Sequence, residues 1–569
     1  MKRIHIYLLL TMLTAGALSC KKNYLDETPQ SFFSTTNAFK TEADFNASVN
    51  NLYGLVRNHY YTVNDFNPFW YQYRTDGFWE ITASVANLPG DISPTGITNF
   101  AWAPHYKIIS EANTIIGRLP TATLTDAQKK LFEAKAKFFR ALGYRSLAYL
   151  YGGVPLILEE IQTPKNDFVR ASRSEVYSQA IEDLKFSAAN LPDIASVKDG
   201  EVANVVAYHL LAEVYNADKQ YQKAVDAATS VISNPAMALM KTRFGTRSTV
   251  TPGDVYWDLF QRGNQNRKAV GNKEAIWVIQ IETDVPGGGG STTGGAQFGV
   301  YSLERVHAPL LRDLRINGVA VFNWPMGDYT GGRGVGFLAP SYWFSDSVWQ
   351  SDFNTDIRNA NHNFVREFVS TNPGSPFYGQ KISYLNPPAN ATGVNGNIVK
   401  GKMDRAFYPY QSKATQPYNF PTSLYANPNS TDPVQKYLLK SGAGGLYVDQ
   451  YFMRLAETYL LRAEAYLGLS NTTLAAQDIN AVRSRAGASA VSPGSVTIDY
   501  ILDERLRELG VEEKRMLTLM RLGKWAERTK KCNPFYGVQM KDNYNLWPIP
   551  FSEIERNTGA VLEQNTGYN

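Results

Sequence analysis

The chain has 569 residues, of which 43 are Gly and 28 are Pro, and these proportions exclude collagen-like and low-complexity proteins. Its length is sufficient for two to four folding units with a large core. The formal net charge of +5 is too small for a surface that reads nucleic-acid phosphates, whereas the aromatic content of 13% is high enough to line a binding surface.

The beginning of the chain has the pattern of an export signal. Two basic residues precede the apolar run Ile4–Leu13, which is too short to span a bilayer, and small residues follow it. Cys20 comes directly after Leu18–Ser19, and this arrangement resembles the lipobox of bacterial lipoproteins. We therefore expect residues 1–19 to be a lipoprotein signal peptide and Cys20 to be acylated after its removal.

An ordinary secretory leader followed by a chance cysteine is the alternative. If Cys20 carries lipid, Cys532 is the one remaining cysteine and cannot form a disulfide within the chain. No later run of 18 apolar residues follows the leader. The mature chain is thus expected to be anchored to a membrane by lipid and not to span it.

The first long helical block is predicted over Thr41–Pro235. Apolar residues recur at steps of three and four over Leu131–Leu150, as on one face of a helix, and Gly152 follows as a stop signal. A further helix is predicted over Ser174–Asn190. Within Val202–Pro235, two short stripes separated by a turn fit the pattern of a tetratricopeptide pair.

A second pair of this kind is predicted to begin near Tyr451. Apolar and small residues stripe its first helix over Ala456–Leu467, with Ala463 at the expected close crossing, and the second helix ends at Gly487. Two such pairs in one chain favour a scaffold of tetratricopeptide-like pairs. Unrelated helical hairpins would give the same periodicity and are the alternative.

The middle of the chain, roughly Phe244–Gly445, loses this periodicity. Ala275–Ile281 is predicted to be a strand, and Gly287–Gly290 marks a flexible loop. The remainder consists of short aromatic-rich segments interrupted by Pro, Asn and Gly. Long irregular stretches inside a compact chain are usually functional loops.

Several segments form a recognisable series in chain order. They are Tyr24–Pro29, Glu111–Ile116, Ala134–Ala141, Gly152–Leu156, Tyr177–Pro192, Arg454–Leu467, Ile479–Gly487, Glu504–Lys524 and Leu546–Pro550. Together they resemble the SusD/RagB family, the surface nutrient-binding lipoproteins of Bacteroidetes-type bacteria. Val511–Lys514 and Thr518–Leu519 depart from the usual family pattern, but the register of their segment holds.

The resemblance implies a mostly α fold, in which tetratricopeptide-like helical pairs form a scaffold beside an irregular loop-rich ligand-binding region with minor β-structure. We accordingly divide the mature chain into an N-terminal helical region of residues 20–240, a ligand-binding region of residues 241–445 and a C-terminal helical region of residues 446–569. The resemblance also implies a partner, a SusC-like TonB-dependent transporter. The lipoprotein would form a lid over this transporter at the outer membrane and face the cell exterior.

Signatures of an enzyme or of a metal centre are sparse. The six His are widely spread without an H-E-x-x-H motif, and no G-x-S-x-G or Walker A motif occurs. Asp352, Asn354 and Asp356 resemble the start of a calcium loop, but Ile357 and Asn363 stand where an EF-hand needs Gly and Glu. We expect neither catalysis nor a cofactor, and a looser calcium site stays open as an alternative.

Two aromatic-rich segments, Tyr60–Trp79 and Trp324–Trp349, are the candidate ligand surface. A sugar presents an apolar face for stacking and a rim of hydroxyl groups, whereas a peptide seeks backbone partners and apolar pockets. The candidate ligand-binding residues are Trp70, Tyr71, Tyr73, Asp76, Trp79, Trp324, Tyr342, Trp343 and Trp349. Core packing is the alternative for each ring, and contact with the transporter is the alternative for some of them.

The leading hypothesis is therefore a surface lipoprotein that captures a glycan or oligosaccharide for a TonB-dependent transporter. A peptide-capturing lid is the second hypothesis, and a glycan-active enzyme is the third.

Overall fold

The computed structural model describes most of the chain. The described residues are 39–61, 69–81, 87–293, 303–328, 332–443 and 445–568. The predicted leader, Cys20 and residues 62–68 of the first aromatic segment lie outside the described residues. Among the helices of the described part, none combines the length and the apolar composition that a membrane crossing requires.

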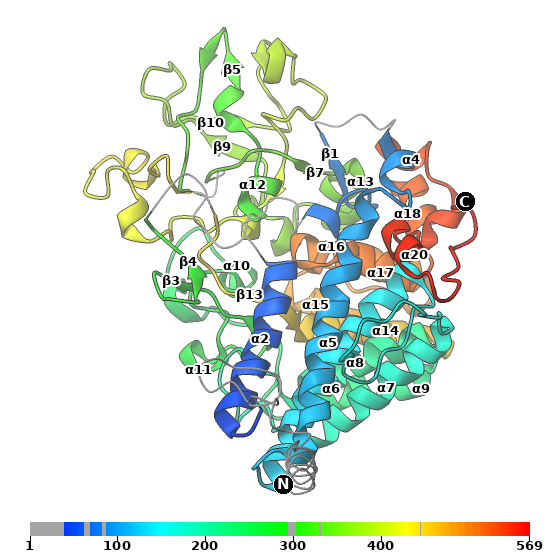
Figure 1. Ribbon diagram of the computed structural model, residues 1–569. Coiled ribbons are helices and arrows are strands. Elements are labelled where there is room, and N and C mark those ends of the chain that lie inside the picture. Colours follow the sequence, from blue (N-terminus) through cyan, green and yellow to red (C-terminus); the bar gives the residue numbers. More distant parts are fainter. Residues whose placement is uncertain are drawn as a thin grey trace, which may run out of the picture.

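The scaffold is a row of helices, each packed against the next (Figure 1). In chain order they are α2 (Glu42–Tyr60), α5 (Trp102–Arg118), α6 (Asp126–Tyr151), α7 (Arg173–Asn190), α8 (Asn204–Ala217), α9 (Tyr221–Ile232), α14 (Leu455–Gly468) and α15 (Thr472–Arg485). Helix α9 packs on α14, although the whole irregular middle separates them in sequence. The two predicted pairs, α8–α9 and α14–α15, are thereby stacked into one scaffold, and the predicted mostly α fold is confirmed.

Capping side chains explain where α6 and α7 begin. The hydroxyl of Thr125 accepts the N–H of Gln128 at 3.3 Å, and the side chain of Gln128 accepts the N–H of Thr125 at 3.0 Å. Ser172 and Glu175 form the same reciprocal pair at the start of α7. Helix α6 ends at Tyr151, and Gly152 follows it with a φ of 78°, in the left-handed region that favours glycine.

Small residues let α14 approach its neighbours closely. Ala463 is fully buried, and a Cβ atom on Gly468 would lie 2.6 Å from the ring of Tyr221 on α9. The side-chain amide of Asn216 donates to the carbonyl of Leu461 at 2.8 Å and joins α8 to the same helix. The prediction of a close crossing around Ala463 thus agrees with the packing of α14.

The second helical pair begins a few residues later than predicted. Gln450–Arg454 form strand β13, which pairs antiparallel with β2 (Ala275–Ile279), and α14 begins only at Leu455. All five residues of β2 are buried, which confirms most of the predicted strand. The pairing joins the irregular middle directly to the C-terminal helices.

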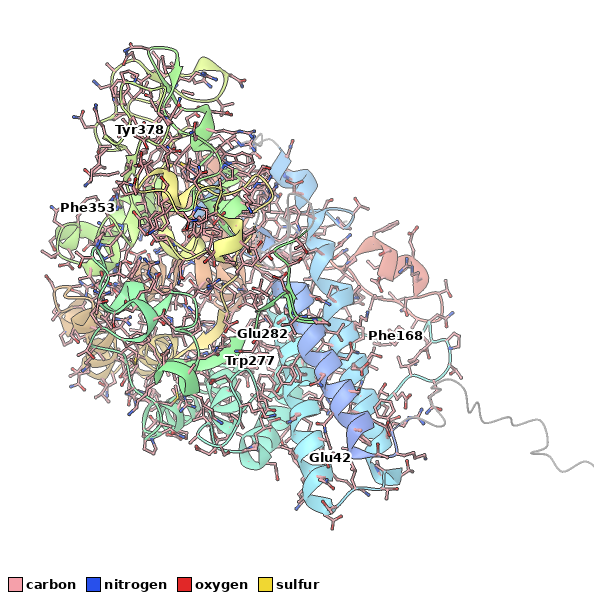
Figure 2. The ribbon with its side chains drawn as sticks, turned by 90° about the vertical axis from the view of Figure 1, so that its left-hand side faces the viewer. Glu42, Phe168, Trp277, Glu282, Phe353 and Tyr378 are labelled. Atoms are coloured by element: carbon pink, nitrogen blue, oxygen red, sulfur yellow. The ribbon has the colours of Figure 1, made fainter. Side chains whose placement is uncertain are left out.

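Regular elements between α9 and β13 are short, apart from β2. The helices are α10 (Val255–Leu259), α11 (Arg267–Val270), α12 (Leu303–His307) and α13 (Tyr342–Ser345). The strands are β3 (Glu282–Thr283), β4 (Gly289–Gly290), β5 (Arg315–Ile316), β6 (Val319–Ala320), β7 (Leu338–Pro340), β8 (Phe364–Val365), β9 (Glu367–Val369), β10 (Lys381–Ser383), β11 (Ala391–Thr392) and β12 (Tyr410–Gln411). Figure 2 shows Tyr378, from this part, at the end of the molecule opposite to Glu42 at the start of α2.

These strands form small sheets of two or three members. The pairs are β9 with β10, β8 with β12, and β3 with β4, and β5 lies between β6 and β11. A further pair joins β7 to β1 (Phe78–Glu80), which precedes α4 (Leu88–Asp91) in the N-terminal part of the chain (Figure 1). Loops therefore make up most of this region, as the lost periodicity predicted.

Helices of the C-terminal segment contact both the scaffold and the irregular middle. Its helices are α16 (Ile498–Glu508), α17 (Arg515–Arg521), α18 (Trp525–Cys532), α19 (Pro534–Gly537) and α20 (Phe551–Arg556). Fully buried Arg358 pairs with Glu504 at 2.8 Å and with Glu508 at 3.0 Å, and Arg454 pairs with Glu508 at 2.5 Å. Because buried charges are tolerated only with partners, this network holds the irregular middle, β13 and α16 in one arrangement.

Candidate functional site

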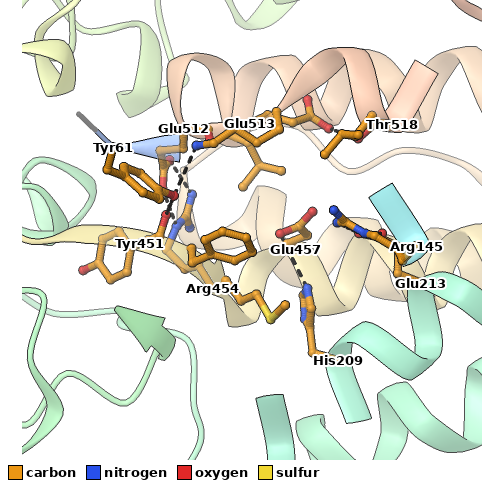
Figure 3. Close-up of a pocket in the computed structure, with 15 residues that line it drawn as sticks. Tyr61, Arg145, His209, Glu213, Tyr451, Arg454, Glu457, Glu512, Glu513 and Thr518 are labelled. Atoms are coloured by element: carbon orange, nitrogen blue, oxygen red, sulfur yellow. Dashed lines mark hydrogen bonds and ion pairs between the residues drawn. The ribbon is translucent and has the colours of Figure 1, made fainter. Parts of the chain in front are cut away.

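A small polar cavity lies where the scaffold meets the C-terminal helices (Figure 3). Its volume is about 50 Å³. Two ion pairs line it: Arg145 with Glu213 at 2.7 Å, and Arg454 with Glu512 at 3.0 Å. The ammonium group of Lys514 donates to the hydroxyl of Tyr61 at 3.1 Å, and burial lowers the pKa of Lys514 to about 7.

This cavity is too small to be an ordinary ligand pocket. Ligand pockets usually have volumes of about 300 to 1,000 Å³, far above the size of this cavity. A volume of about 50 Å³ is enough for one or two water molecules, each of which occupies about 30 Å³ in the liquid. The aromatic segments are therefore the better candidates for a ligand site.

The two predicted aromatic segments meet at the sheet formed by β1 and β7. The strands are antiparallel and place Trp79 opposite Ala339, and β7 leads almost directly into α13, which begins at Tyr342. The ring of Trp79 stacks on that of Phe535 with centroids 3.5 Å apart and planes inclined by 8°. The ring of Tyr342 lies 5.9 Å from that of Phe535. We call Trp79, Tyr342 and Phe535 the aromatic platform.

A cleft of about 460 Å³ opens beside the aromatic platform, and we call it the aromatic cleft. It is lined by Trp79, Ile81, Val394, Asn395, Asn397, Lys402, Met403, Asp404 and Arg405. The N–H of Met403 donates to the hydroxyl of Tyr342 at 3.3 Å, which ties the platform to the opposite wall. The volume is within the range of ligand pockets, and the lining combines an aromatic ring with amide and charged groups.

Residues 394–405 form a wall of the cleft, and hydrogen bonds within this loop stabilise its shape. One carboxylate oxygen of Asp404 accepts the N–H groups of Val394 and Ala406, both at 2.9 Å. Asn395 has a φ of 58°, in the left-handed region that Asn adopts more readily than most residues. Asn395 and Asn397 are both exposed, so their amide groups are free to meet the hydroxyl groups of a ligand.

Four predicted ligand residues lie in the interior, out of reach of a ligand in this structure. They are Tyr71, Tyr73, Asp76 and Trp349, each at most 4% exposed. The hydroxyl of Tyr71 hydrogen-bonds with His59 at 2.7 Å, and the indole N–H of Trp349 donates to the carbonyl of Phe344 at 3.1 Å. These aromatic rings are core residues, the alternative that the sequence left open.

Asp76 is an internal anchor. Its carboxylate pairs with Arg515 at 2.7 Å and with Arg528 at 3.0 Å, and none of these side chains is exposed. Burial by itself raises the pKa of Asp76, but the two arginines outweigh burial and lower it to about 2. Its backbone carbonyl accepts the hydroxyl of Ser341 at 2.7 Å. Asp76 thereby fixes β1 relative to β7, α17 and α18.

Three further predicted residues are half-buried but do not line the aromatic cleft: Trp70, Trp324 and Trp343. The ring of Trp70 packs edge-on against that of Phe69, with centroids 4.9 Å apart. The guanidinium groups of Arg312 and Arg333 each lie 4.8 Å from the ring of Trp324. Trp343 follows Tyr342 but faces α16, where its indole N–H donates to Asp503 at 2.9 Å. Of the nine candidates, Trp79 lines the cleft and Tyr342 borders it.

Sequence reasoning missed Phe535 and the wall formed by residues 394–405. Phe535 lies in the C-terminal region that we assigned to the scaffold, and its contact with Trp79 links distant parts of the chain. The wall lies in the irregular region, where a composition rich in Asn and Gly was the available signal. That composition predicts a loop but does not say what the loop faces.

The carboxylates of the calcium-like stretch have arginine partners. Asp356 pairs with Arg358 at 2.6 Å, and Asp352 pairs with Arg483 at 2.5 Å. Over the described ranges, no group of three or more His, Cys, Asp or Glu side chains is arranged to hold a metal ion. A calcium site stays a prediction, without a set of ligands to locate it.

A second groove lies along the outer face of α5 and has a volume of about 400 Å³. Its mainly apolar lining includes Trp102, Tyr106, Ile157, Ile161, Phe168 and Leu562. Ile161 is 45% exposed, whereas Trp102 is 5% exposed and belongs to the core. We call this feature the apolar groove. A smaller share of its lining is polar than in the aromatic cleft, so it suits a different class of ligand.

Comparison with known sequences gives matches along nearly the whole chain. A family model described as "SusD family" matches residues 273–568, and one described as "Starch-binding associating with outer membrane" matches residues 23–216. "SusD-like protein P2" of Formosa agariphila is 24% identical over 609 aligned positions that cover 100% of both chains. "Starch-binding protein SusD" of Bacteroides thetaiotaomicron is 35% identical over 119 residues, which are 20% of this chain and 21% of that protein.

Solved structures share the fold. A "Laminarin binding SusD-like protein" has a TM-score of 0.61 at 23% identity, with 93% of this chain and 100% of that chain covered. "Surface glycan-binding protein A" from Bacteroides thetaiotaomicron, in complex with laminarihexaose, has a TM-score of 0.64 at 20% identity, with 92% and 100% covered. At such identities the likeness establishes the fold alone.

Proposed function

Because the chain belongs to the SusD family, we propose that it is a binding protein that captures a glycan in the aromatic cleft. The observation that carries this proposal is the stacked pair of Trp79 and Phe535 at a cleft that also presents the amides of Asn395 and Asn397. The ring offers an apolar surface to a sugar face, and the amides offer donors and acceptors to its hydroxyl groups. Relatives named for starch or laminarin support a glycan as the ligand class.

The proposal extends to the place of the protein in the cell. Acylated Cys20 would anchor it to the outer membrane, facing the cell exterior, and a SusC-like TonB-dependent transporter would receive the glycan beneath it. The lipobox-like leader and the family description "associating with outer membrane" support this arrangement. Relatives named for binding support capture, and not cleavage, as the role.

Replacing the cleft aromatic tests the proposal. Trp79→Ala should weaken glycan binding by about tenfold or more, because it removes a stacking contact of on the order of 1 kcal/mol in addition to buried apolar area. Calorimetry against a panel of neutral and charged polysaccharides provides the affinity, and thermal unfolding shows whether the fold is kept. Trp343→Ala is the matched control: its ring faces α16, so we expect lower stability and unchanged affinity. Wild-type affinity in Trp79→Ala contradicts the proposed site.

Peptide capture is the second candidate function, and the apolar groove favours it. A peptide docks apolar side chains into shallow pockets, and the groove presents Ile161 and Phe168 at its lining. Phe168→Ala should then weaken the binding of a peptide mixture and leave glycan binding unchanged. Absence of any calorimetric signal with the peptide mixture excludes this candidate, whereas a signal that depends on Phe168 and not on Trp79 supports it over glycan capture.

A further inference from the structure

Two cations line the aromatic cleft without a carboxylate partner. Lys402 is exposed and Arg405 is half-buried, and neither has an ion-pair partner among the residues that the structure describes. The guanidinium of Arg405 uses Nε to donate to the carbonyl of Val335 at 2.9 Å, which fixes its position beside the cleft. Its two terminal amino groups have no acceptor within the described part of the chain. By contrast, the buried arginines Arg358 and Arg454, in the ion-pair network around Glu508, each have several carboxylate partners.

The acidic residue in the cleft lining, Asp404, offsets only one of these two positive charges. Asp404 is 8% exposed, and one of its oxygens is already occupied by the N–H groups of Val394 and Ala406. Its carboxylate therefore stabilises the loop rather than meeting a ligand. Lys400, two residues before Lys402, is also exposed but lies outside the cleft lining. The charge that the loop presents to a ligand is thus positive.

A ligand that covers the cleft removes water from these two groups. Withdrawing a charge from water is costly unless a partner replaces the lost hydration. The hydroxyl groups of a neutral sugar replace it only weakly, whereas an anionic oxygen forms a charge-assisted hydrogen bond that is about twice as strong. The guanidinium fork of Arg405 matches a carboxylate or a sulfate with two parallel N–H groups.

We infer that the aromatic cleft takes an anionic saccharide, with a sugar ring against Trp79 and a carboxylate or sulfate group against Arg405 and Lys402. This inference rests on the proposed glycan function and adds the charge class of the ligand. The shared chemistry is a planar or tetrahedral oxyanion on a sugar. It has two sources, the carboxylate of a uronic acid and a sulfate ester, which the experiment distinguishes.

The first measurement is calorimetry of the mature protein with three oligosaccharides of matched length. The probes are an oligogalacturonate, a sulfated oligogalactan and a neutral laminari-oligosaccharide. At low salt, at least one anionic probe should bind about tenfold more tightly than the neutral probe. Because an ionic strength of about 1 M shortens the screening length to about 3 Å, the difference should shrink in high salt.

Variants then test the two cations separately. Lys402→Met and Arg405→Gln should each weaken the binding of the preferred anionic probe by about three- to tenfold and leave the binding of the neutral probe nearly unchanged. Arg405→Lys keeps the positive charge but loses the planar pair of N–H donors. Its affinity for the preferred anionic probe should lie between those of wild type and Arg405→Gln. Lys400→Met removes an exposed cation from the same loop, outside the cleft lining, and is the matched control with near-wild-type affinity. Thermal unfolding of each variant identifies any loss that comes from misfolding.

The outcomes separate this inference from the proposed function. The inference is overturned if the neutral probe binds as tightly as both anionic probes, if neither anionic probe binds, or if Lys402→Met and Arg405→Gln both bind like wild type. Binding of the neutral probe that depends on Trp79 would leave the proposed function intact in each of these cases. Unchanged binding of every probe in Trp79→Ala overturns the proposed function itself.

Discussion

Asp76→Asn removes one negative charge from the interior and barely changes the size of the side chain. The sequence placed Asp76 in the ligand surface, where this substitution would weaken glycan binding and leave the fold intact. The structure predicts the reverse, because Asp76 is fully buried and accepts hydrogen bonds from Arg515 at 2.7 Å and from Arg528 at 3.0 Å. The variant should lose stability, and its folded form should bind glycan as the wild type does.

Two effects set how much the free energy of unfolding falls in Asp76→Asn. Lowering the pKa of Asp76 from 3.8 to about 2 corresponds to about 2 kcal/mol, at about 1.4 kcal/mol per pKa unit. Removing one member of a buried ion pair costs about 3 to 5 kcal/mol, because the remaining charge is left without its partner. Here Arg515 keeps Glu513 and Arg528 keeps Asp503, which softens the loss. We therefore expect the free energy of unfolding to fall by about 2 to 4 kcal/mol at pH 7.

Unfolding by urea, followed for wild type and variant at a series of pH values, measures this difference. The pKa of Asp76 is lowered on folding, so its ionised form stabilises the protein above the unfolded value near 3.8. That stabilisation is lost as the pH falls towards about 2. The difference in the free energy of unfolding between wild type and Asp76→Asn should have its full size at pH 7 and should decrease below about pH 4.

Glu367→Gln is the matched control, because it also turns a carboxylate into an amide at an ion pair. Glu367 pairs with Lys381 at 2.9 Å, but its side chain is 41% exposed. Its loss should change the free energy of unfolding by no more than about 0.5 kcal/mol. An Asp76→Asn variant that unfolds at the wild-type urea concentration and binds glycan poorly would refute our placement of Asp76.

The remaining predictions concern the network, the scaffold and the anchor. Glu508→Gln should cost about 3 to 5 kcal/mol, because three buried arginines share this carboxylate, and calorimetric melting at the wild-type temperature would contradict that role. Ala463→Leu should cost about 1 to 3 kcal/mol by overpacking α14, so unchanged thermal stability would argue against the close crossing. Cys20→Ser should appear in the soluble fraction of cells that lack the transporter, and its retention by membranes would contradict lipid anchoring.

The helical scaffold could be predicted because its signals are local. The stripe over Leu131–Leu150 and the stop at Gly152 lie within one helix, and α6 ends one residue before that glycine. The strand at Ala275 was equally visible as an apolar run, but its partner was not. Gln450–Arg454 became β13 because the backbone groups of β2 need a partner, a tertiary requirement that periodicity does not encode.

The sequence shows which segments resemble the family, but it does not show why these segments contain so many Arg and Glu residues. Arg454 and Glu508 stand in two of them, and they meet as a buried ion pair at 2.5 Å. Local sequence predicts solvent-facing charges for a helix rich in Arg and Glu, because such side chains are usually exposed. Their burial depends on Arg358 and Glu274, which come from the irregular middle and complete the network.

The same limit applies to the aromatic cleft, whose composition was visible in the sequence but whose geometry was not. Successive residues of a strand point to opposite faces, so the register of β1 against β7 decides which ring of the first segment reaches the cleft. With Trp79 opposite Ala339, Phe78 is buried and Trp79 lines the cleft. A shift of one residue would send Trp79 into the core. Asp76 ties the start of β1 to Arg515 and α18, so it stabilises the strand that carries Trp79 without contacting a ligand, and its loss should lower stability while the folded form keeps its glycan affinity.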